Sequence, residues 1–241
     1  MSKFSIKAVV LVGYLVLIHG LLAIALARTE LLNLVGQKLH VLKPQIPEEE
    51  SIIPRLREAY KNMDASIPAG VTIFLGDSIT MSLATPAVAQ NSINFGIGWQ
   101  RSDQLLQSME AYSSIARAKR VVVAIGTNDL LQGREEGIES RYQMLLKRIP
   151  ADVDIVMSSV PPIGNISFYG VHQVRDSNVR AVVESARRVC KSDNRCRFVD
   201  AYAVLTRDGK PIEGVLLQDE IHLTPKGYAL WINALKSEIE A

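Results

Sequence analysis

The sequence is poor in the features that mark several classes of protein. It has only two cysteines, and they lack the further Cys or His neighbours that a metal site needs. Lys and Arg (27) nearly balance Asp and Glu (25), which leaves no basic stripe for nucleic acid. Aromatic residues are only 6% of the chain, and repeats and low-complexity tracts are absent. What remains is one globular domain with an appendage, for which 241 residues suffice.

One long apolar run is present near the N-terminus. Residues 8–27 contain no charged side chain, and at about 1.5 Å per residue such a helix spans the hydrocarbon core of a bilayer. Lys3 and Lys7 precede it, which favours a cytoplasmic N-terminus. We therefore expect residues 1–28 to anchor a single-pass membrane protein whose domain lies outside the cytoplasm. The alternative is a signal peptide cleaved after the small-x-small pattern at 25–27, which gives a secreted protein.

Export would change the interpretation of the two cysteines. Cys190 and Cys196 flank a polar turn between a helical pattern and a strand pattern. An oxidising compartment permits a disulfide there, although closing so short a loop contributes modest stability. Two reduced thiols are the alternative.

Residues 29–68 have the pattern of a stalk. Apolar residues at helical spacing are followed by three prolines and the acidic run 48–50. A short helix is expected over Ile53–Met63, before the first strand. The apolar stripe is typical of a helix that rests on the bilayer or the domain, and self-association is the alternative. The domain itself is expected over residues 69–241.

Strand and helix patterns alternate from Val71 onward. The expected strands are Val71–Leu75, Ser92–Phe95, Val121–Ile125, Asp154–Ser158 and Arg197–Asp200. The expected helices are Asp103–Arg117, Glu135–Arg148, Val174–Val189 and Pro225–Ile239. Apolar strands that alternate with amphipathic helices indicate a parallel sheet covered on both faces. The predicted fold is a three-layer α/β domain with five parallel strands.

A serine follows the first of these strands. Gly76 ends the strand, and Asp77 and Ser78 come next, at the sheet edge where open α/β folds bind ligands. Asp and Ser after a strand are also ordinary helix N-caps, so this stretch alone does not identify a nucleophile. Further polar motifs after later strands change that interpretation.

Those motifs supply the components of an acyl-transfer site. A serine hydroxyl needs a base to take its proton, and His222 precedes the last helix. Asp219, three residues earlier, suits the role of the acceptor that orients this imidazole. The oxyanion needs donors, for which the backbone N–H groups of Ser78 and Gly96 and the side-chain amide of Asn128 are candidates.

Four motifs follow one another in the chain: Gly-Asp-Ser (76–78), Asn-Phe-Gly (94–96), Gly-Thr-Asn-Asp (126–129) and Asp-x-x-His (219–222). With these motifs in this order, the chain resembles the SGNH hydrolases, the GDSL esterase/lipase superfamily. The name's four residues correspond to Ser78, Gly96, Asn128 and His222. The resemblance covers about residues 70–230 and implies a flavodoxin-like fold, a Ser-His-Asp triad, and no metal or other cofactor. Many members have Gly at the place of Glu220, and a Glu there is strained if the backbone needs a positive φ.

The fold also suggests which residues shape a substrate cleft. Trp99, Arg101, Ile163 and His172 are the candidates, with Arg101 able to meet an anionic substrate or to be an ordinary surface arginine. Asp77 and Asp129 are interpreted as structural.

The sequence therefore predicts a membrane-tethered serine esterase that acts outside the cytoplasm. Its partners would be an acyl-ester substrate and the membrane, with no nucleic acid. The expected substrates are O-acetyl groups on envelope or exported polysaccharide, or lipid esters such as lysophospholipids. The alternatives are an O-acyltransferase of the same fold and a catalytically silent domain that binds glycans or assembles a complex.

Overall fold

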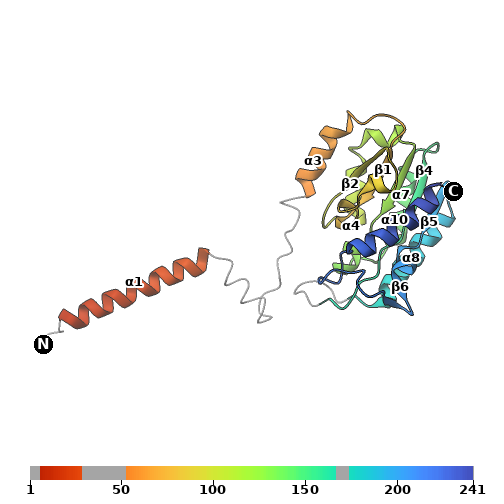
Figure 1. Cartoon of the computed structure of the whole chain (residues 1–241). Helices are drawn as coiled ribbons and strands as arrows, with labels where there is room; N and C mark the ends of the chain where they lie inside the picture. Colours follow the sequence, from red (N-terminus) through yellow and green to blue (C-terminus); the bar gives the residue numbers. More distant parts are fainter. Residues whose placement is uncertain (1–5, 29–52, 167–173, 241) are drawn as a thin grey trace. The chain divides into compact units, whose positions relative to one another are not determined.

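The computed structural model describes residues 6–28, 53–166 and 174–240. The chain divides into two compact units, Met1–Ile46 and Pro47–Ala241. The first unit contains helix α1, Ile6–Arg28, and the second contains every other described element (Figure 1).

The expected membrane anchor requires correction. Among the residues that the structure describes, no helix is long and apolar enough to cross a membrane. The prediction of a single-pass membrane protein held through residues 1–28 is therefore wrong.

The second unit is built on one sheet of five parallel strands. These are β1 Thr72–Gly76, β2 Ser92–Gly96, β3 Arg120–Ala124, β4 Asp154–Ser158 and β5 Cys196–Val199. Their spatial order is β2-β1-β3-β4-β5, the flavodoxin-like order. Gly76 is level with Gly96 on one side and with Ala124 on the other, so the carboxyl ends of these three strands form one edge.

Alternate residues of β1, β3, β4 and β5 enter two separate apolar cores. In β1, Ile73 and Leu75 belong to one core and Phe74 to the other, because successive side chains of a strand point to opposite faces. Residues of the helices α5 (Ser102–Met109), α7 (Ile138–Lys147) and α8 (Asp176–Lys191) join the first core. Residues of α9 (Ala201–Leu205) and α10 (Pro225–Glu240) join the second core. The sheet is thus covered on both faces, as the continuous apolar strands predict.

The helices of this unit follow the expected alternation, with several short additions. They are α3 Ile53–Asp64, α4 Ser78–Met81, α5 Ser102–Met109, α6 Thr127–Leu131, α7 Ile138–Lys147, α8 Asp176–Lys191, α9 Ala201–Leu205 and α10 Pro225–Glu240, with 3₁₀ turns η1 Thr85–Ala87 and η2 Ser113–Arg117. A small antiparallel hairpin joins β6 Thr206–Arg207 to β7 Lys210–Pro211. These short elements carry too few residues for a periodic pattern.

The expected helix over Asp103–Arg117 is divided into α5 and η2. Asp64, at the end of α3, accepts hydrogen bonds from Ser113 Oγ (2.6 Å) and from the Ser114 backbone N–H (3.1 Å). These bonds hold the chain in a tight 3₁₀ turn. A contact with a residue so distant in sequence leaves no trace in the local periodicity.

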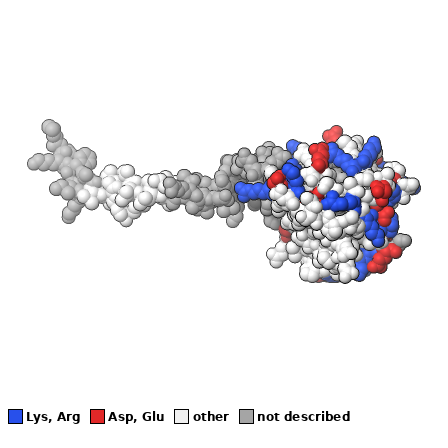
Figure 2. All heavy atoms as spheres, turned by 90° about the horizontal axis from the view of Figure 1, so that it is seen from above, with Lys and Arg blue, Asp and Glu red and all other residues white. Residues whose placement is uncertain are grey.

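The two cysteines are joined in a disulfide. Cys190 lies near the end of α8 and Cys196 begins β5, so the bond ties this helix to the amino end of its following strand. Charges on the surface are mixed: Figure 2 shows Lys and Arg interspersed with Asp and Glu on the face that it presents.

Candidate active site

The nucleophile candidate lies at the first turn after β1. A Cβ on Gly76 would overlap Thr80 Oγ1 and the Ala124 carbonyl, so only glycine fits where the strand turns into α4. Asp77 caps this helix by accepting a hydrogen bond from the Ile79 N–H at 3.0 Å. Ser78 is thereby placed at the first position of the helix, at the carboxyl edge of the sheet.

The loop before α10 brings an imidazole to this serine. His222 Nε2 lies 2.8 Å from Ser78 Oγ, and His222 Nδ1 lies 2.6 Å from Asp219 Oδ2. The other carboxylate oxygen of Asp219 accepts the N–H groups of Ile221 (3.0 Å) and His222 (2.9 Å). The three side chains predicted as a triad therefore lie in one hydrogen-bonded row.

The protonation of this row follows from the contacts of its carboxylate. Burial alone would raise the pKa of Asp219, but hydrogen bonds from the His222 backbone and ring and from Ile221 bring it below the usual value. Asp219 is therefore ionised at neutral pH and accepts the Nδ1–H of the imidazole. That tautomer leaves Nε2 as the acceptor for a proton from Ser78.

Two side chains that the sequence analysis did not single out hold helix α4 in place. Asn94 Nδ2, from β2, donates to the carbonyls of Thr80 (2.7 Å) and Leu83 (3.1 Å). The Tyr228 hydroxyl, from α10, donates to the Ile79 carbonyl at 2.8 Å. Asn94 belongs to the motif around Gly96, but nothing in the sequence indicates the contact of Tyr228.

The expected oxyanion donors differ in their availability. Asn128 Nδ2 donates to the Gln100 carbonyl at 3.1 Å, which uses one of its two hydrogens. The Gly96 N–H donates to Asn94 Oδ1 at 2.9 Å, so it is committed to a side chain of its own strand. The role of the Gly96 N–H as an oxyanion donor stays a prediction. Glycine is required at Gly96 for another reason, because a Cβ there would overlap the backbone of α4 at Met81.

Two buried carboxyl groups, Asp77 and Asp129, are direct sequence neighbours of the site residues Ser78 and Asn128. Burial raises the pKa of Asp77 to about 7. Burial also raises the pKa of Asp129, which accepts hydrogen bonds from Ser102 Oγ (2.6 Å) and Ser102 N–H (2.9 Å) and pairs with Arg141 (3.3 Å). Asp77 thus bonds the first turn of α4, and Asp129 bonds the first residue of α5 and Arg141 of α7.

The four cleft candidates have different environments. Trp99 is 44% exposed and has a φ of 65°, a left-handed conformation that costs a non-glycine residue on the order of 1–2 kcal/mol. Arg101 bonds Asp103 (3.0 Å) and Gln132 (2.9 Å), so its guanidinium is already paired. Ile163 packs partly against the first core, and His172 lies outside the described residues.

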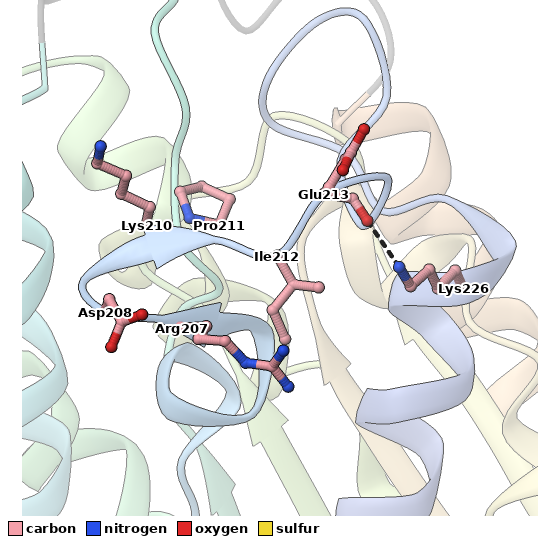
Figure 3. A pocket seen from close by; sticks show the side chains of 7 residues that line it. All are labelled: Arg207, Asp208, Lys210, Pro211, Ile212, Glu213 and Lys226. Carbon is pink, nitrogen blue, oxygen red and sulfur yellow. Dashed lines mark hydrogen bonds between the residues drawn. The ribbon is translucent and has the colours of Figure 1, made fainter.

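A hollow elsewhere on this unit contains none of these residues. It has a volume of about 580 Å³ and lies between the β6–β7 hairpin and the start of α10 (Figure 3). Its lining residues are Arg207, Asp208, Lys210, Pro211, Ile212, Glu213 and Lys226. Lys226 Nζ already donates to the Glu213 carbonyl at 2.7 Å, and the hollow is separate from the triad.

Comparison with known proteins agrees with this geometry. A model of the GDSL-like Lipase/Acylhydrolase family matches residues 74–230, which include all three triad positions. The chain belongs to this family. As a GDSL-like acylhydrolase it is a serine ester hydrolase, as the sequence motifs predicted. A search of curated proteins gave no match.

Solved structures share the fold of this GDSL-like protein at low sequence identity. A protein from Streptococcus pneumonia whose name refers to platelet activating factor has a TM-score of 0.69 at 18% identity, covering 76% of this chain and 91% of that one. A GDSL-like lipase from Bacteroides thetaiotaomicron has a TM-score of 0.60 at 20% identity (76% and 97%). An acetylxylan esterase from Geobacillus stearothermophilus has a TM-score of 0.55 at 18% identity (70% and 95%). At such identities these likenesses establish the fold.

Proposed function

We propose that the chain hydrolyses a carboxylic ester through an acyl-enzyme intermediate on Ser78. The observation that carries the proposal is the unbroken row Asp219–His222–Ser78, with 2.6 Å and 2.8 Å between its polar atoms. Such a row is needed to activate a serine hydroxyl, since the hydroxyl is a weak nucleophile at neutral pH.

The residues would act in two half-reactions. Ser78 Oγ attacks the ester carbonyl while its proton passes to His222 Nε2, and Asp219 stabilises the imidazolium that forms. The imidazolium then protonates the departing alkoxide, which leaves as the alcohol. In the second half-reaction His222 takes a proton from the water that attacks the acyl-serine. The imidazolium then returns this proton to Ser78 Oγ as the bond to the acyl carbon breaks, which releases the carboxylic acid and restores the free enzyme.

The negative charge on the carbonyl oxygen requires preorganised donors during both steps. The backbone N–H of Ser78, at the first turn of α4, and the remaining hydrogen of Asn128 Nδ2 are the donors that we assign to it. O-acetylated polysaccharide and lipid esters, the two substrate classes expected from the sequence, both fit this chemistry. The acetylxylan esterase named above is one relative by fold that acts on the first class.

The test is hydrolysis of p-nitrophenyl acetate and butyrate by the full chain, compared with Ser78→Ala and Asp219→Asn. We expect losses in kcat of up to about 10⁶-fold for the first and about 10⁴-fold for the second. Ser177→Ala, an exposed serine on α8, is the matched control and should retain full activity. A fluorophosphonate probe should label the full chain and not Ser78→Ala. Undiminished turnover or labelling of Ser78→Ala would refute the mechanism.

A further inference from the structure

Some of the large apolar side chains that remain exposed on the second unit adjoin the triad. Within residues 53–166 and 174–240, which the structure describes, five such side chains are exposed: Met63 40%, Met81 43%, Trp99 44%, Met144 46% and Leu217 45%. Three of them, Met81, Trp99 and Leu217, adjoin the triad. Exposed apolar side chains that cluster around a reactive group indicate a binding surface.

Met81 lies on the same side of α4 as the nucleophile. It follows Ser78 by three residues, a spacing that places two side chains on one face of a helix. A Cβ built on Gly98 would lie 3.7 Å from Met81 Cε and 4.0 Å from Ser78 Cβ. The thioether end of Met81 and the serine thus both border Gly98.

Leu217 lies beside the imidazole. Leu216 and Leu223 form an antiparallel bridge, and the Leu217 N–H donates to the His222 carbonyl at 2.8 Å. Residues opposite one another in such a pair project to the same face, and the next pair projects to the other face. Leu216 and Leu223 pack into the second core, so Leu217 and His222 share the outward face.

Trp99 is the third of these side chains and lies in the loop between β2 and α5. It follows Gly98 directly, and its indole is exposed although its backbone is held in the left-handed region. Strained conformations persist where the surrounding structure imposes them, often at functional sites. The nearby Arg101 is paired with Asp103 and Gln132, so it offers no free charge to an anionic group here.

We propose that Met81, Trp99 and Leu217 form an apolar rim that binds the hydrocarbon chain of the substrate. This inference rests on the proposed function, and it narrows the substrate to esters with an apolar chain of several carbons rather than acetylated sugars. Each methylene that the rim removes from water contributes up to about fourfold in kcat/KM.

The test measures kcat/KM of the full chain along two ester series. In one, p-nitrophenyl esters run from acetyl to octanoyl, and in the other, alkyl acetates run from ethyl to octyl. We expect at least one series to rise tenfold or more with chain length. Met81→Ser, Trp99→Ala and Leu217→Ser should each lower the long-to-short ratio of that series fivefold or more. Met144→Ser, on α7 and equally exposed, is the control and should leave the ratio unchanged.

The possible outcomes distinguish a failure of the apolar rim from a failure of the proposed esterase activity. If Ser78-dependent hydrolysis stays constant or falls with chain length in both series, the proposed apolar rim is refuted. The proposed esterase activity is still supported in that case. A rise that the rim variants do not reduce, or that Met144→Ser reduces equally, also refutes the apolar rim. Absence of Ser78-dependent hydrolysis with every ester refutes the proposed function itself.

Discussion

The backbone N–H of Gly164 donates to the carbonyl of Glu220 at 2.8 Å. Glu220 has a φ of 60°, and its side chain lies where a Cβ on Gly164 would be. The loop after β4 is thus packed against Glu220, which directly follows Asp219 of the triad. Both sides of this contact depend on unusual residues, since Glu220 occupies a conformation that favours glycine and Gly164 leaves the room for its side chain.

A pair of variants tests this contact. Gly164→Ala should displace the Glu220 side chain and lower kcat about 10- to 100-fold, because small shifts of a catalytic loop are costly. The double variant Gly164→Ala/Glu220→Gly should recover most of that loss, since the overlapping carboxylate is gone. Glu220→Gly alone should raise the free energy of unfolding by about 1 kcal/mol by relieving the backbone. Equal losses in the single and double variants would show that the side-chain overlap is irrelevant.

The buried carboxyl of Asp77 should make stability depend on pH. Its folded pKa of about 7 exceeds the ordinary 3.8, so between these values the folded state holds a proton that the unfolded state has released. Stability should therefore fall as pH rises through this window and level off above it. Urea unfolding at pH 5 and pH 8 should show a decrease about 3 kcal/mol larger than in Asp77→Asn, which keeps the capping oxygen. The same decrease in both proteins would exclude Asp77 as its source.

Asn94 should matter for both stability and turnover. Asn94→Ala removes donors to the Thr80 and Leu83 carbonyls and the acceptor for the Gly96 N–H. We expect about 1–3 kcal/mol of lost stability and a lower kcat, because α4 carries Ser78. Chemical unfolding and initial rates at saturating ester measure the two effects. Asn91→Ala, at an exposed position before β2, is the control. Native turnover in a destabilised Asn94→Ala would separate the anchoring of α4 from catalysis.

The disulfide should contribute to stability and not to chemistry. Cys190–Cys196 closes a short loop at the amino end of β5, whereas the triad lies past the carboxyl ends of the strands. Cys190→Ser/Cys196→Ser should lose about 2 kcal/mol of unfolding free energy and keep its kcat at 25 °C. Thermal unfolding with and without a reductant gives the same comparison in the unaltered chain. A large loss of kcat in the folded variant would contradict this separation.

The parts of the fold that could be predicted are those encoded by local pattern. The strand Asp154–Ser158 has its predicted bounds. β1, β3 and β5 are each displaced by one residue, and β2 begins as predicted but ends one residue later. In these segments the short apolar run in the sequence is the same stretch that the folded sheet buries. The sequence pattern therefore predicts the strand directly. Helix α5 ends early because Ser113 and Ser114 bond Asp64, a contact between distant segments that periodicity does not contain.

The candidate site likewise has features that short motifs predict and features that depend on contacts made only in the folded chain. The residues of the row Asp219–His222–Ser78 could be named because each stands in a short motif after a strand or before a helix. The commitment of the Gly96 N–H to Asn94 Oδ1 depends on a side-chain rotamer, which no motif specifies. The paired state of Arg101 and the exposure of Leu217 depend on neighbours brought together by folding.

The separation of 144 residues between Ser78 and His222 has a consequence for biosynthesis. The nucleophile leaves the ribosome early, while its base and the Tyr228 hydroxyl that holds helix α4 are made near the end of the described chain. Synthesis at about 5–20 residues per second delays these partners by roughly 7–30 s. During that interval the nascent chain carries a serine without its base. The complete triad therefore forms only after the loop with His222 has been made and helix α10 has docked.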